Sequence, residues 1–250
     1  MINVVRSYSN HSLHTEIGNI IRTHSANRTD IRSVANNMVQ WKNVRRIIDL
    51  GCGYGWYEDE LEGDFDLIVG IDCLPENGPP FVSRAEKIAR EAIFKMHRLP
   101  ETVDYHEGYF DVAISAYSLY FFPDVLPEIE RILQKAGIFL AITHSESMLE
   151  EGKRFFDFKN LRTVIESFSA ENGEALLRKY FSDITAVEYS NSLIFRRGDE
   201  KKLSLYIDFK REFISKDVDP ALVRKTMLGE LGRYGELRLS KNDKIFVAKK

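Results

Sequence analysis

The run from Val44 to Gly55 constrains the fold most. A β-prone segment, Val44–Leu50, ends directly in the sequence Gly51-Cys52-Gly53-Tyr54-Gly55. Such a segment closed by glycines predicts a strand, a tight turn and then a helix. Glycines at alternate positions let the backbone bend sharply and let a ligand approach closely, since a side chain there would collide with it. The run therefore indicates a ligand-binding turn, although a tight turn without a ligand remains the simpler alternative.

Strand-like and helix-like runs alternate after this turn. The apolar runs that predict further strands are Leu67–Ile71, Ala92–Met96, Phe110–Ser115, Gly137–Thr143, Ile184–Tyr189 and Lys244–Ala248. Between two of them, Pro123–Lys135 has apolar residues at helical spacing and Gly137 just beyond its end. This alternation predicts an α/β fold with a mostly parallel sheet and right-handed crossovers.

The flanking regions have helical periodicity. Two helices are expected before Val44, with a break near Ser25-Ala26-Asn27, and a later helix is expected to begin at Asp219-Pro220. We therefore predict one domain over residues 1–250. It comprises an N-terminal helical cap (1–43), a ligand-binding core (44–145) and a region of lid helices and final strands (146–250).

Composition narrows the function classes. The net charge of −3 provides no broad basic surface, so nonspecific nucleic-acid binding is not favoured. The two cysteines, Cys52 and Cys73, are too few for a disulfide framework and lack the companions of a zinc site, so no metal is expected. The chain shows neither a secretory signal nor an apolar run of roughly 20 residues, and we expect a cytoplasmic protein without a membrane span.

The form of the glycine turn narrows its ligand. A dinucleotide fingerprint would have a third glycine at the position of Trp56, and no Lys-Ser/Thr pair follows to make a phosphate loop. Asp49 provides a carboxylate that can bind a cationic amine. Asp72 follows the next strand, where a carboxylate can accept from two ribose hydroxyls, although a turn cap is the plainer interpretation of a lone Asp.

Several segments together resemble the class I S-adenosylmethionine-dependent methyltransferases, of the small-molecule type. They are Asp49–Gly55, Gly70-Ile71-Asp72, Leu99-Pro100, Phe110–Ser115 and Leu133–Gly137, in the family's order and spacing. The resemblance covers the stretch from Val44 to Ser145. It implies a Rossmann-like, seven-stranded, mostly parallel sheet with helices on both faces and an antiparallel last strand. It also implies S-adenosylmethionine as the cofactor.

The same resemblance implies positions for the cofactor's parts. Asp49, Gly51 and Gly53 would line the methionine end, and Asp72 would hold the ribose. Lys95 and Met96 would flank the adenine, although the family often has an acid at the position of Lys95. Ala116 and Tyr117 would line the path to the sulfonium. Cys52 and Cys73 are expected to be buried, inert fillers beside the cofactor.

Two residues are candidates for catalysis. Tyr117 follows the fourth strand and His144 ends the fifth, so both are expected at the same carboxyl edge of the sheet as Asp72. We expect His144 to accept a proton at neutral pH and Tyr117 to orient the acceptor with its hydroxyl. The alternative is that both are polar residues that merely shape a strand terminus.

Absent motifs bear on the substrate. Nucleic-acid enzymes of this class that methylate amino groups carry an Asn/Asp-Pro-Pro-aromatic turn where this chain has Ser115-Ala116-Tyr117-Ser118. The Pro-Cys nucleophile of the cytosine-carbon enzymes is also missing. We therefore expect a small-molecule methyl acceptor. An RNA or protein methyltransferase with partner-supplied specificity, and a catalytically silent cofactor-binding subunit, remain alternatives, and the acceptor atom and oligomeric state stay open.

Overall fold

The computed structural model describes residues 11–155, 159–213 and 218–250, so residues 1–10 of the predicted cap lie outside the described residues. The chain divides into two compact units. The sheet unit comprises residues 29–144, 166–189 and 243–250, and the helical unit comprises residues 1–28, 145–165 and 190–242. The division into cap, core and lid stays a prediction.

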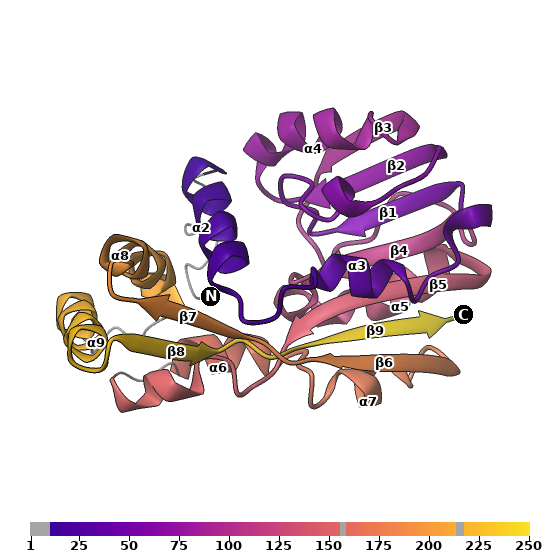
Figure 1. Ribbon diagram of the computed structural model, residues 1–250. Coiled ribbons are helices and arrows are strands. Elements are labelled where there is room, and N and C mark those ends of the chain that lie inside the picture. The colour runs from indigo at the N-terminus through magenta and orange to yellow at the C-terminus, as the bar shows by residue number, and fades with distance from the viewer. Residues whose placement is uncertain (1–10, 156–158, 214–217) are drawn as a thin grey trace. The chain divides into compact units, whose positions relative to one another are not determined.

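A seven-stranded sheet forms the centre of the sheet unit (Figure 1), with the strand order β3-β2-β1-β4-β5-β9-β6. The strands are β1 (Arg46–Leu50), β2 (Phe65–Asp72), β3 (Ala89–Met96), β4 (Phe110–Ala116), β5 (Leu133–His144), β6 (Asp183–Tyr189) and β9 (Asp243–Lys249). β9 runs antiparallel to both of its neighbours, whereas the pairs from β3 to β5 are parallel. The predicted Rossmann-like sheet with an antiparallel last strand is confirmed.

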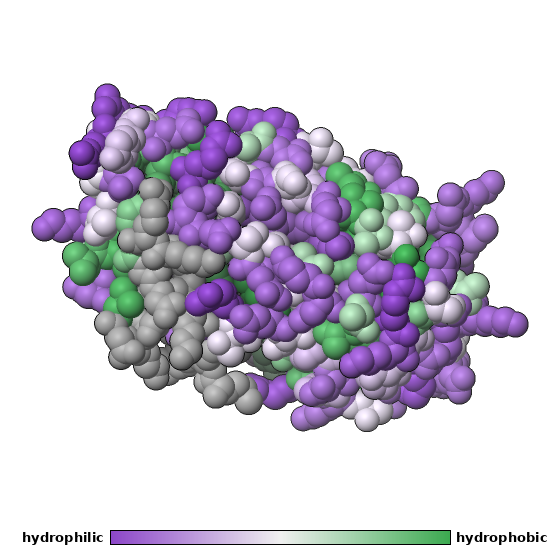
Figure 2. All heavy atoms as spheres, turned by 90° about the horizontal axis from the view of Figure 1, so that it is seen from below, coloured by the Kyte–Doolittle hydropathy of each residue, from purple (hydrophilic) through white to green (hydrophobic). Residues whose placement is uncertain are grey.

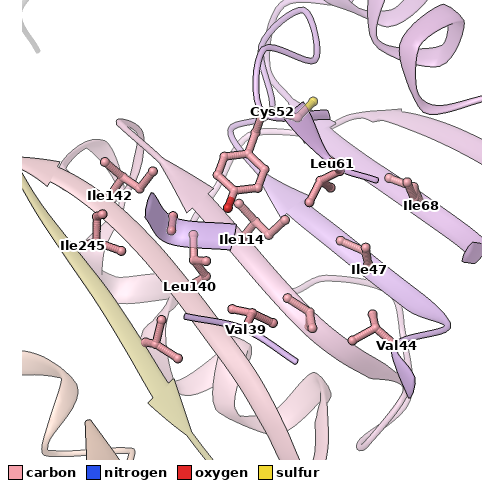
Figure 3. Packing of buried hydrophobic residues seen from close by; sticks show 14 of the residues in the cluster. Val39, Val44, Ile47, Cys52, Leu61, Ile68, Ile114, Leu140, Ile142 and Ile245 are labelled. Carbon is pink, nitrogen blue, oxygen red and sulfur yellow. The ribbon is translucent and has the colours of Figure 1, made fainter. Parts of the chain in front are cut away.

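Helices cover both faces of this sheet. Helices α3 (Ile31–Asn36) and α4 (Gly78–Ala85) contribute Ile31, Ala35 and Phe81 to an apolar cluster on one face. Figure 3 shows part of this cluster, in which Ile47, Ile68, Ile114, Leu140, Ile142 and Ile245 come from neighbouring strands. On the other face lie α5 (Leu126–Ile132) and α7 (Gly173–Leu177). Because β1 and β4 are buried on both sides, apolar residues occupy consecutive positions in them, as in Ile47-Ile48 and Val112-Ala113-Ile114, rather than alternate positions.

The segment after the glycine turn differs from the sequence prediction. A helix was expected there, but the chain forms only a 3₁₀ turn, Glu58–Glu60, before β2 begins at Phe65. Few residues separate Gly55 from Phe65, and five of them are acidic: Glu58, Asp59, Glu60, Glu62 and Asp64. A longer helix would place these like charges on neighbouring turns, which is unfavourable. Helix α3 packs on this face of the sheet instead.

The helical unit has its own apolar core. Its helices are α2 (His11–His24), α6 (Lys159–Ile165), α8 (Glu200–Phe209) and α9 (Pro220–Tyr234), and its antiparallel strand pair is β7 (Ser192–Arg196) with β8 (Glu236–Ser240). As predicted, Asp219 caps α9, because its side chain accepts a hydrogen bond from the Ala221 N–H at 2.9 Å. The β7–β8 pair was not predicted.

Polar and charged side chains predominate on the face shown in Figure 2, with smaller apolar areas between them. Apolar side chains scattered in this way are normal on a folded surface. Among the described residues, none of the helices has the length and apolar character needed to cross a membrane.

Candidate functional site

The glycine turn follows β1 directly in the chain and is hydrogen-bonded to the end of β2. Gly51, Gly53 and Gly55 have φ angles of +75°, +53° and +83°, all in the left-handed region that favours glycine. The N–H groups of Gly51 and Cys52 both donate to the Ile71 carbonyl, at 2.8 and 3.1 Å. These bonds fix the turn against the last residues of β2.

Two glycines of the turn face different surroundings. A Cβ atom on Gly51 would lie 2.4 Å from the Ser118 Cβ atom, so this glycine permits close packing against the end of β4. A Cβ atom on Gly53 would meet nothing within 4 Å. Gly53 therefore presents bare backbone to open space, which is what a ligand that lies against the turn requires.

This difference predicts unequal stability losses. Gly53→Ala is expected to cost about 1–2 kcal/mol, the strain of a left-handed alanine. Gly51→Ala adds the overlap with Ser118, which raises the expected loss to about 2–5 kcal/mol. Denaturant unfolding of both variants measures the free energies of unfolding. Equal losses would contradict the packing described here.

Two carboxylates flank the turn. Asp72, at the end of β2, accepts from the Gly53 N–H with one oxygen and from the Leu74 N–H with the other, both at 2.9 Å. The Asn77 side chain and the Cys73 N–H also lie within hydrogen-bonding reach of this carboxylate. Asp49, in β1, is 2% exposed, and its Oδ1 atom meets no hydrogen-bond donor. Burial raises the pKa of both carboxyls.

The remaining predicted cofactor residues lie near this edge, with one correction. Met96 is paired in register with Asp72 and is 64% exposed, and the Lys95 ammonium lies 4.0 Å from the Tyr105 ring centre. Cys52 is buried, as expected, whereas Cys73 is exposed, so the expectation of a buried filler was wrong for Cys73. Cys73 follows the last residue of β2, where the chain passes out of the sheet to the surface.

His144 and Tyr117 meet at the end of the sheet, and a third residue joins them. His144 Nδ1 lies 2.6 Å from one Asp243 oxygen, and the Tyr117 hydroxyl donates to the other at 2.7 Å. Asp243 is fully buried at the start of β9 and pairs in register with His144. With Nδ1–H donated to Asp243, His144 Nε2 carries the lone pair, as in a proton acceptor.

Aromatic rings surround this group. The Tyr117 and His144 rings stack with centres 4.6 Å apart, Tyr120 lies 5.9 Å from His144, and Trp56 lies 5.8 Å from Tyr117. Tyr117 has a φ of +59°, a strained conformation that is found most often at functional sites. Burial, and then the charge of Asp243, raises the pKa of Tyr117, so its hydroxyl stays protonated at neutral pH.

The structure thus brings the predicted residues together in two groups along one edge. Asp72 contacts the glycine turn, and His144 contacts Tyr117, next to Ala116 at the end of β4. Strands β1 and β4 lie between the ends of β2 and β5. At about 4.8 Å per strand, the two groups are about 14 Å apart across the sheet.

Sequence reasoning missed Asp243 and Trp56. Asp243 is separated from His144 by 99 positions, and only the antiparallel pairing of β9 with β5 brings it close. The residues Lys241-Asn242-Asp243 form a turn pattern just before the predicted strand Lys244–Ala248. This pattern does not indicate which residue Asp243 contacts. Trp56 was noted only because it stands where a dinucleotide-binding turn has its third glycine.

Residues 48–141 match the sequence model of a family described as "Methyltransferase domain". No curated protein sequence matches the chain.

Several solved structures share the fold. The YcgJ protein of Bacillus subtilis is 16% identical with a TM-score of 0.57, and the match covers 87% of this chain and 98% of that one. A putative methyltransferase of Bacillus halodurans is 10% identical with a TM-score of 0.59, covering 88% and 98%. A protein of Thermotoga maritima, described as an S-adenosylmethionine-dependent methyltransferase and possible histamine N-methyltransferase, is 13% identical with a TM-score of 0.54, covering 99% and 100%.

The fold and the family match point to the same conclusion. The seven-stranded sheet has the predicted order of parallel strands with an antiparallel β9, and the matched residues include the glycine turn and the end of β2. Residues 48–141 thus form a methyltransferase domain on a Rossmann-like sheet, and S-adenosylmethionine is the cofactor of such a domain.

Proposed function

We propose that the protein binds S-adenosylmethionine along the carboxyl ends of β1, β2 and β4 and methylates a small-molecule acceptor beside His144. One observation carries this proposal: the bare backbone of Gly53 faces open space, and its N–H donates to the carboxylate of Asp72. A ligand that carries a cationic group and a ribose needs both open backbone and a nearby carboxylate. A turn that binds no ligand needs neither.

The residues present fit each part of the cofactor. The unpartnered Oδ1 of Asp49 suits its ammonium group, and the carboxylate of Asp72, at the end of β2 beside Gly53, suits its ribose hydroxyls. The exposed side chain of Met96, beside Asp72, offers an apolar surface to the adenine. The other residues proposed to line the cofactor are Gly51, Cys52, Cys73, Lys95 and Ala116.

When bound, the cofactor supplies a methyl group activated by a sulfonium. The protein then has to align the acceptor and remove its proton. We assign proton removal to His144 Nε2, with Asp243 holding Nδ1–H and stabilising the positive charge that the ring gains. Tyr117 gives its only hydroxyl proton to Asp243, so it fixes that carboxylate and packs its ring against His144.

A small-molecule acceptor is favoured over a macromolecule. The chain has a net charge of −3, which does not favour a phosphate backbone. One protein with the same fold is described as a possible histamine N-methyltransferase, and another, from Galdieria sulphuraria, as a putative sarcosine dimethylglycine methyltransferase. Both descriptions name acceptors that are small amines. The cytoplasmic location and the oligomeric state stay open.

A methyl-transfer screen tests the acceptor class. The protein is incubated with methyl-labelled S-adenosylmethionine and, separately, with a metabolite extract, total RNA and total protein. We expect label in the metabolite fraction, and much less label when Asp72→Ala replaces the wild type at a cofactor concentration near the wild-type dissociation constant. Label confined to RNA or protein would overturn the small-molecule assignment. Cofactor binding without transfer to any fraction would indicate a silent subunit.

A further inference from the structure

Two buried carboxyls lie against each other behind the glycine turn. Asp49 is in β1, Glu58 opens the 3₁₀ turn that follows the glycines, and each is 2% exposed. Their side chains are within hydrogen-bonding reach of each other. Yet Asp49 Oδ1 and both carboxyl oxygens of Glu58 meet no hydrogen-bond donor among the described residues.

These two observations fit together if the pair holds a proton. Ionised carboxylates only accept hydrogen bonds, so two of them in contact repel unless one is protonated and donates to the other. Burial raises the pKa of Glu58 to about 7, and burial together with the charge of Glu58 raises the pKa of Asp49 well above its usual range. In the free protein at neutral pH, the pair therefore holds at least one proton.

Among the described residues, the cations near the pair are two arginines that bind other acidic groups. The other titratable groups that act on the pair are Cys52, Tyr57, Asp59, Asp72 and Arg84, and the neighbourhood of Tyr57 adds Arg32 and Glu60. Arg84 donates to Asp59 and to the Tyr54 carbonyl, and Arg32 pairs with Asp30. Both arginines thus have acidic partners of their own, and the pair keeps an excess of negative charge to offer to a ligand.

We propose that Glu58 is part of the cofactor site, and that Glu58 and Asp49 exchange their shared proton for the ammonium group of S-adenosylmethionine. This inference rests on the proposed cofactor site. On binding, the ammonium N–H groups donate to both carboxylates, and the displaced proton leaves to solvent. The pair gains one negative charge as the ammonium brings one positive charge, so the net buried charge does not change.

Proton exchange makes cofactor affinity depend on pH. Below the pKa of the free pair, each binding event must release a proton, so affinity falls tenfold for each unit of pH. With the pKa of Glu58 raised to about 7 and that of Asp49 raised well above its usual range, affinity is expected to fall more than tenfold between pH 8 and pH 6. The ligand's own amine, with an ordinary pKa of about 7.7–8.0, is already protonated at pH 6 and releases nothing there.

Isothermal titration of the full chain with S-adenosylmethionine at pH 6 measures the exchange. Two buffers that differ strongly in protonation enthalpy give the number of protons released, and we expect at least one per ligand bound. S-adenosylhomocysteine, which keeps the ammonium and lacks the sulfonium charge, should release the same number. Glu58→Gln keeps the side-chain shape and a donor to Asp49. It should release fewer protons than the wild type, and its affinity should fall less between pH 8 and pH 6.

Glu62→Gln is the matched control, because Glu62 is an exposed carboxyl one helical turn further along. It should behave as the wild type. Binding without proton release by the wild type would overturn this inference alone, as would equal release by wild type and Glu58→Gln. Absence of binding at every pH would overturn the proposed cofactor site as well. Even if Glu58→Gln fails to fold, the number of protons that the wild type releases on binding tests this inference.

Discussion

Replacing His144 by alanine is expected to lower kcat by about 10²- to 10⁴-fold, the usual contribution of a positioned general base. Only Nε2 of His144 has the lone pair for this role, because Nδ1 is held by Asp243 at 2.6 Å. The affinity for S-adenosylmethionine should stay within about threefold, or about 0.65 kcal/mol, because the glycine turn and Asp72 are untouched. The kcat is measured with the acceptor that the transfer screen identifies.

A pH profile distinguishes the base from a residue that shapes the pocket. The wild type should lose activity toward acid pH as the base becomes protonated, and His144→Ala should lose this acid limb. Tyr117→Phe removes one hydrogen bond to Asp243 but keeps the ring that stacks on His144, so it should lower kcat less and keep the acid limb. His106→Ala, which removes an exposed histidine, serves as the control. An unchanged kcat in His144→Ala would contradict the assignment of His144 as the general base.

Asp72→Ala is expected to weaken the binding of S-adenosylmethionine by about 10- to 150-fold, which corresponds to about 1.5–3 kcal/mol for hydrogen bonds to a charged group. The substitution acts in two ways. It leaves the ribose hydroxyls without acceptors, and it releases the Gly53 and Leu74 N–H groups that hold the turn. Titration calorimetry gives the dissociation constants.

Glu76→Ala provides the matched control for Asp72, since it removes an exposed carboxylate four residues further along the same loop. Its affinity should equal that of the wild type. A folded Asp72→Ala variant that binds normally would show that the ribose does not rest on this carboxylate.

The sequence predicted the sheet well because its signals are local. Buried parallel strands are continuously apolar, as in Ile47-Ile48 and Ala113-Ile114, and glycines mark the turn that follows β1. The N-cap at Asp219 was predictable for the same reason, since a cap depends on residues adjacent in the chain.

The features that were missed depend on contacts between distant segments. Asp243 reaches His144 only through the pairing of β9 with β5. Glu58 meets Asp49 only because the expected helix after the glycine turn is replaced by a 3₁₀ turn. The β7–β8 pair brings together strands some 40 residues apart, a separation at which no turn signal announces a hairpin.

A crystal structure of the full chain with S-adenosylhomocysteine tests the central claim most directly. The account predicts the ribose hydroxyls at hydrogen-bonding distance from Asp72, the ammonium group at Asp49 and Glu58, and the sulfur atom directed toward Tyr117 and His144. A ligand bound elsewhere, or bound with its ribose away from Asp72, would contradict it.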